Sequence, residues 1–199
     1  MNRHLANFKS AVLAAMLLAA CGAGDKGPAE TALKAAEQAI NVAKSEASKY
    51  LPDQTRFLVT ALAAAKGKFY RGDYKAVLAE VPTLRSLAQE LANAAAAKKA
   101  ELIKSWDALS LGMPRVVEVI KNRVDTLAQS KKLPAGMSAD SLARAKAGVD
   151  EIAQQWTAAT DASKGGNLVD AVSRVNFAKD KAAEVLTLLK MPVPVALRG

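Results

Sequence analysis

The sequence is short of the residues that carry most enzyme and metal chemistry. Its 199 residues include one cysteine, Cys21, and one histidine, His4, and only 5% are aromatic. A single cysteine excludes an internal disulfide, so the stability of the fold must come from packing. The apolar run Ala11–Ala20 has ten residues and is too short to span a bilayer.

The first twenty residues have the layout of a secretory signal peptide. Arg3 and Lys9 supply a basic start, and the apolar run follows them. The small residues Ala19 and Ala20 then stand directly before Cys21. We therefore predict that residues 1–20 form a signal peptide that is removed from the mature protein.

The stretch Leu18-Ala19-Ala20-Cys21 resembles the lipobox of bacterial lipoprotein precursors. The resemblance implies cleavage between Ala20 and Cys21, diacylglycerol on the Cys21 thiol and acylation of the new amine. Two or more acyl chains hold a protein stably in a bilayer. The alternatives are a buried cysteine in an uncleaved helix, or an ordinary signal peptide that is cut elsewhere.

Residues 21–30 are rich in glycine and are expected to form a flexible tether. Gly22, and not aspartate, follows the cysteine. In the enterobacterial sorting rule that such lipoproteins follow, this residue favours the outer membrane, with the protein facing the periplasm.

The mature chain is basic. Without Arg3 and Lys9 it has 26 Lys and Arg against 19 Asp and Glu, an excess of about +7. The expected partners are the lipid bilayer, through acylated Cys21, and an envelope protein or anionic envelope component. Nucleic acid is not expected, because no aromatic-rich basic motif is present.

From Thr31 onward the apolar residues recur at three- and four-residue steps, which predicts an all-α fold. We expect an elongated bundle of about six helices over residues 31–190, followed by a non-helical tail at 191–199. Asp53 is the expected N-cap of the second helix, and Pro82 is expected to kink or restart the third. The breaks between helices fall at 51–53, 71–73, 112–114, 131–136 and 164–167.

Two helical hairpins within the chain have related sequences. An ungapped offset of 94 residues sets Gly72 on Gly166 and Asp73 on Asn167, which predicts two hairpins of common design. Chance matches in an alanine-rich chain are the alternative. The same offset also pairs Ala64 with Ala158, Ala65 with Ala159, Val81 with Val175, Ala88 with Ala182 and Glu90 with Glu184.

Residues 31–91 loosely resemble the alanine-rich helical hairpin domains of unknown function found in bacterial lipoproteins. The resemblance rests on Leu33 to Tyr50, the break at Pro52, Ala61 to Lys66 and Gly72-Asp73-Tyr74. It implies a helical hairpin and brings no known activity or catalytic residue.

Candidates for catalysis are few. Once the signal peptide is removed and Cys21 is acylated, the chain has no imidazole base and no free thiol, and neither a metal nor a cofactor is expected. Two carboxylate pairs remain as candidate acids and bases, Asp150 with Glu151 and Glu118 with Asp125. Both lie among lysines and arginines, which favours a solvated face. A non-enzymatic protein is therefore expected.

The two tryptophans are expected to have different roles, one in the core and one at a binding site. Trp156 lies within an apolar seam and is expected in the core, whereas Trp106, with Met113, is the candidate contact for a ligand or partner. The apolar tail is expected to fold back on the bundle, with binding to a partner as the alternative. The sequence favours a helical scaffold or adaptor in the cell envelope. A carrier or sensor for an apolar or anionic ligand is the alternative, and a carboxylate hydrolase is a weaker third.

Overall fold

The computed structural model describes residues 24–198, and this part of the chain is helical with no strand. The expected all-α fold is thus confirmed. The helical segments number six, or five if α2 and α3, which only Leu51 separates, are joined. They are α2 (Lys26–Tyr50), α3 (Pro52–Tyr70), α4 (Tyr74–Ser110), α5 (Met113–Ala128), α6 (Ala139–Lys164) and α7 (Leu168–Leu188), with a 3-10 turn η1 (Val195–Leu197).

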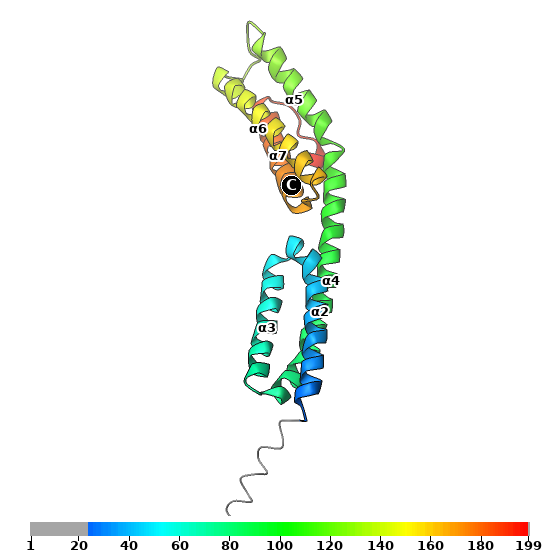
Figure 1. Ribbon diagram of the computed structural model, residues 1–199. Helices are drawn as coiled ribbons and strands as arrows, with labels where there is room; N and C mark the ends of the chain where they lie inside the picture. Colours follow the sequence, from blue (N-terminus) through cyan, green and yellow to red (C-terminus); the bar gives the residue numbers. More distant parts are fainter. Residues whose placement is uncertain (1–23, 199) are drawn as a thin grey trace, which may run out of the picture. The chain divides into compact units, whose positions relative to one another are not determined.

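The range predicted as one bundle contains two compact units, which meet in the sequence between Ala97 and Lys98. The N-terminal unit consists of α2, α3 and the first part of α4, which run up, down and up beside one another (Figure 1). The C-terminal unit consists of the end of α4 with α5, α6, α7 and η1. Helix α4 therefore contributes residues to both units.

The N-terminal unit has a narrow core of small and branched side chains. Helix α2 buries a seam of apolar residues at the predicted three- and four-residue steps. These residues are Ala29, Leu33, Ala36, Ile40, Ala43, Ala47 and Tyr50. The seam of α4 is also buried as predicted. Its members in this unit are Val77, Val81, Leu84, Ala88, Leu91 and Ala95.

The two hairpin turns adopt the same conformation. Gly72 and Gly166 have φ angles of 85° and 77°, a left-handed region that glycine enters without strain. Around Gly72, the Arg71 amide donates to the Gly67 carbonyl and the Asp73 amide to that of Lys68. The same bonds recur 94 residues later, from the Gly165 amide to Asp161 and from the Asn167 amide to Ala162.

The offset of 94 residues also relates the buried residues of the two hairpins. Each of the six α4 seam residues of the N-terminal unit has a buried counterpart, five in α7 and one at the residue that caps its C-terminal end. The counterparts are Ala171, Val175, Ala178, Ala182, Val185 and Leu189. The α3–α4 and α6–α7 hairpins are therefore built on one pattern, as the sequence predicts.

Two local predictions were wrong, and of the kink or restart predicted at Pro82 the restart was wrong. The tether is shorter than residues 21–30, because α2 begins at Lys26 and the burial of Ala29 holds its first turn. Asp53 is not the N-cap of α3; the helix begins at Pro52, and Asp53 lies in its first turn, where it pairs with Arg56. Helix α4 runs through Pro82 without a restart. Packing on both sides of the proline outweighs the loss of one backbone hydrogen bond.

The C-terminal unit packs α6 tightly against α7. Gly148 permits the close approach, since a Cβ built on it would lie 2.4 Å from Cγ2 of Val185. The tail after α7 folds back on this unit, as predicted, and Leu197 of η1 is buried in its core. No helix between residues 24 and 198 is both long and apolar enough to cross a membrane.

Candidate functional site

The predicted lipidation and cleavage residues, Cys21 and Ala20, lie outside the described residues. The two residues predicted to contact a ligand or partner, Trp106 and Met113, lie in the C-terminal unit. Met113 is 1% exposed and belongs to the core. Trp106 is half-buried and stacks on Trp156, with ring centroids 6.0 Å apart and planes 10° apart. The two tryptophans thus pack against each other at the edge of the core.

The candidate carboxylates are on the surface, as a solvated face requires. Glu118, Asp125 and Asp150 are exposed. Glu151 is exposed as well, and its carboxylate lies 3.2 Å from the ammonium group of Lys181. The pKa of Lys181 is raised, because it donates hydrogen bonds to Glu184 and Glu151. These groups form a surface ion-pair cluster.

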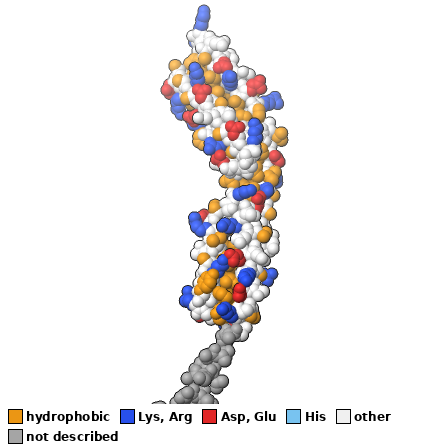
Figure 2. Space-filling view, viewed as in Figure 1, with side chains coloured by type: hydrophobic (Ala, Val, Ile, Leu, Met, Phe, Trp, Pro, Cys, Tyr) orange, Lys and Arg blue, Asp and Glu red, His pale blue; other side chains and the backbone are white. Residues whose placement is uncertain are grey.

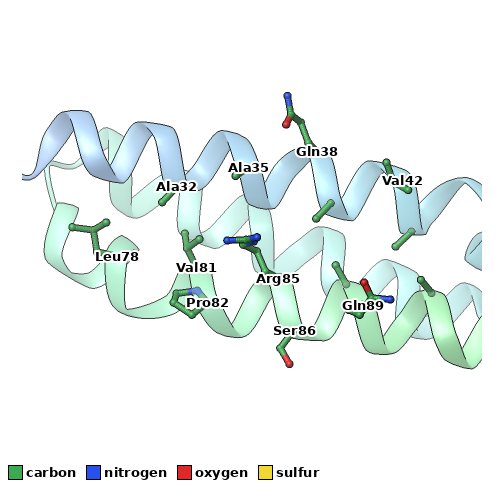
Figure 3. A pocket seen from close by; sticks show the side chains of 14 residues that line it. Ala32, Ala35, Gln38, Val42, Leu78, Val81, Pro82, Arg85, Ser86 and Gln89 are labelled. Carbon is green, nitrogen blue, oxygen red and sulfur yellow. The ribbon is translucent and has the colours of Figure 1, made fainter.

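An open groove of the N-terminal unit runs between α2 and α4 and has a volume of about 960 Å³. Its floor is made mainly of alanine, because small side chains on both helices leave space along their line of contact. Polar groups stand among them from Gln38, Arg85, Ser86 and Gln89. In Figure 3, Arg85 extends from α4 into the space between the two helices, beside Val81 and Pro82. The apolar part of the lining is Ala32, Ala35, Ala39, Val42, Ala43, Leu78, Val81, Pro82, Ala88 and Ala92.

Arg85 is the only cation that lines this groove, and within residues 24–198 it has no ion-pair partner. Pro82, one turn before it, has no N–H, so the carbonyl oxygen of Leu78 lacks its usual helical donor. The groove therefore presents a guanidinium group without an ion-pair partner among alanine and other apolar side chains. Val42, at its edge, is 75% exposed.

Sequence reasoning missed this groove. Arg85 follows a seam residue, Leu84, and reads as one more charge on a solvated face. The signal that would have found it is the run of alanines at 32, 35 and 39, which lies next to the predicted seam of α2. Small residues beside a seam leave a hollow where larger ones would fill it.

The C-terminal unit has a smaller apolar pocket of about 410 Å³ between α5, α7 and the tail. Val116, Val119, Leu186 and Met191 line it, and Arg115 is its only charged residue. Arg115 also has no ion-pair partner in the part of the chain that the structure describes. The pocket has the shape and charge for an apolar group with an anionic end.

Charges of both signs are interspersed over the visible face of each unit, with hydrophobic side chains between them (Figure 2). No group of three or more His, Cys, Asp or Glu among residues 24–198 is placed to hold a metal ion. Comparisons of the chain with protein-family models, curated proteins and solved structures find no match.

Proposed function

We propose that this protein is a lipid-anchored lipoprotein of the outer membrane, facing the periplasm, that acts as a non-catalytic scaffold or adaptor. The observation that carries the proposal is the α2–α4 groove, which is lined by both apolar and polar side chains and contains one unpaired cation, Arg85. Docking surfaces of this kind bind a partner helix by its apolar face and fix it with a small number of polar contacts.

The anchor would hold this groove close to the bilayer. Only residues 22–25 separate Cys21 from the first helical residue, Lys26. Whatever their conformation, the chain between Cys21 and Lys26 spans about 18 Å at most. The N-terminal unit is therefore the part of the protein that meets a partner at the membrane surface.

The chemistry of the groove defines the partner. An alanine floor admits the close approach of a helix that itself carries small or branched side chains. A carboxylate on that helix would form a charge-assisted hydrogen bond with Arg85. The expected partner is an envelope protein that presents an apolar helix with an acidic residue.

Photo-crosslinking in intact cells tests this docking. A photoreactive amino acid at Ala35, in the groove, is expected to give an adduct with a single partner, and Arg85→Glu is expected to abolish it. Ala63 on α3 is exposed, lies outside the groove and serves as the control position. Lys75→Glu, a charge reversal on α4 away from the groove, is expected to leave the adduct intact. An adduct that persists in Arg85→Glu contradicts the proposal.

A second candidate function, a carrier for an apolar anionic ligand, is favoured by the pocket beside Arg115. Binding there would place the acyl part against Val116 and Leu186 and the anionic end on Arg115. A saturable change in tryptophan fluorescence on adding a fatty acid, lost in Arg115→Ala, would support the carrier over the scaffold.

A further inference from the structure

A second surface of the N-terminal unit, distinct from the α2–α4 groove, is apolar and open. Phe57 of α3 is 65% exposed. It stands with Leu87 of α4 between two hollows, one of about 580 Å³ and one of about 410 Å³, and both residues line both hollows. The α3–α4 face therefore carries an aromatic knob with a recess on either side.

In the C-terminal hairpin, the equivalent surface positions carry polar side chains that link the two helices. At the offset of 94 residues, Phe57 and Leu87 correspond to Glu151 and Lys181. These two form an ion pair at 3.2 Å that crosses from α6 to α7. One turn further along α6, Gln155 accepts a hydrogen bond of 3.2 Å from Arg174 of α7. Polar links thus cross one hairpin where the other has an exposed phenylalanine beside a half-buried leucine.

The outer stripe of α3 is complementary to itself. Its residues, at intervals of three or four, are Asp53, Phe57, Ala61, Ala64 and Lys68. Read in the opposite direction, the stripe places an acid opposite a base and a large side chain opposite a small one. The Asp53 side chain is 84% exposed and remains accessible to a second cation although it pairs with Arg56. The Lys68 side chain is 34% exposed and pairs with Glu80 of α4 within its own chain, so Asp53 of a second copy would share the ammonium group with Glu80. The Glu90 side chain adds a negative charge at the same end of the face.

We propose that two copies of this chain associate through their α3–α4 faces, antiparallel about a two-fold axis near Ala61. Phe57 of each copy enters the hollow lined by Ala61 and Ala64 of the other. Asp53 of each copy lies against Lys68 of the other. Such an interface is isologous, because the knob and the recess belong to one patch and exchange roles under the two-fold operation.

Disulfide trapping tests whether the two-fold axis of the proposed dimer lies near residue 61. Cys21 is the only cysteine of the chain, so Cys21→Ser leaves an introduced cysteine as the only thiol. In the purified full-length chain, Ala61→Cys is expected to give covalent dimers under mild oxidation, since the two copies of residue 61 meet at the axis. Ala63→Cys is the matched control. It has the same original residue and lies about 200° around the helix from residue 61, so it is expected to stay monomeric.

Sedimentation equilibrium measures how much Phe57 contributes to the stability of the dimer. Phe57→Ala is expected to raise the dissociation constant of the dimer at least about tenfold, as for a buried aromatic anchor. Phe177→Ala removes another exposed aromatic, 48% accessible in the C-terminal unit, and is expected to leave the constant unchanged. Asp53→Lys, which sets like charges against each other, is expected to weaken the dimer.

Two outcomes overturn the proposal. One is a chain that remains monomeric up to about 100 µM, a concentration at which even weak self-association is visible. The other is equal cross-linking of Ala61→Cys and Ala63→Cys. In the first case, a Phe57 position that cross-links a different protein in cells assigns the face to that protein. The α2–α4 groove is tested separately, because Arg85→Glu leaves the α3–α4 face unchanged.

Discussion

Gly148 of α6 and Val185 of α7 define the closest approach of two helices in the C-terminal unit. A Cβ on residue 148 would stand 2.4 Å from Cγ2 of Val185, a distance that non-bonded carbon atoms in different residues essentially never show. Glycine is therefore required there by space, and not by backbone conformation. In the N-terminal hairpin the corresponding residues are Gln54 and Leu91, which line an open hollow.

Gly148→Ala is expected to lower the free energy of unfolding by about 1–3 kcal/mol, because the added methyl group forces α6 and α7 apart. Gly67→Ala, also inside a helix, is the control. A Cβ there would meet only the end of the Arg71 side chain at 3.4 Å, so that variant is expected to gain about 0.5–1 kcal/mol. Urea denaturation measures both. Equal effects of the same sign would refute the steric explanation.

Lys190→Gly is expected to stabilise the protein by about 1 kcal/mol. Lys190 has a φ of 56°. At the end of α7 the Met191 amide donates to the Leu186 carbonyl and the Lys190 amide to the Thr187 carbonyl, the same pattern of bonds as around Gly72. Glycine relieves the strain of this left-handed conformation. Gly72→Ala and Gly166→Ala introduce the same strain and are expected to lower stability by similar amounts. Thermal melts of the three variants decide the matter.

Part of the stability of the C-terminal unit is expected to be lost at alkaline pH, because it comes from the charged form of Lys181. Its pKa is raised above the ordinary 10.5 by hydrogen bonds to Glu184 and Glu151. The stabilisation is therefore complete below pH 10.5 and is lost as the pH rises through the raised value. Lys181→Met should melt below the wild type at pH 7, and the gap should close in alkali. Lys146→Met, on the exposed side of α6, should melt like the wild type throughout.

The Trp106–Trp156 stack is expected to contribute a coupling of about 0.5–1.5 kcal/mol in a double-mutant cycle of Trp→Leu changes. Because the rings face each other, anionic lipid vesicles are expected to give no saturable shift of tryptophan emission. A saturable shift would instead favour the carrier function and would show that the stack opens.

Cys21→Ser is expected to move the protein from the membrane fraction to the soluble fraction, or to leave an unprocessed precursor. The reason is that, under the proposed lipidation, acyl chains attached to this residue would supply the anchoring energy. Fractionation with labelled fatty acid measures the effect. A mutant that keeps both its label and its membrane association would disprove lipidation at Cys21.

The periodicity of the apolar residues predicted most of the fold. Each helix buries one stripe of its surface, and the spacing of the apolar residues identifies that stripe. The seam from Val77 to Ala95 and the common design of the two hairpins could both be read in this way. The end of the tether could not, since the burial of Ala29 depends on packing against other helices. The continuity of α4 through Pro82 was equally hidden, because tertiary contacts outweigh a local penalty.

The candidate site was much harder to predict than the fold. Trp106 was chosen for its position near the end of the long third helix, yet its place is decided by Trp156, fifty residues away in the sequence. Arg85 and Phe57 are residues that a pattern assigns to solvent. Their interest comes from the hollows beside them, and the volume of a hollow depends on how closely two helices approach.

The paired turns at Gly72 and Gly166 set the angular phase of the helices that follow them. Each residue advances an α-helix by about 100°, so one residue inserted into the α3–α4 turn would rotate the whole α4 stripe by that angle. Polar side chains would then face α2 and α3. The length of a three-residue loop thus decides which side of a 37-residue helix meets its neighbours.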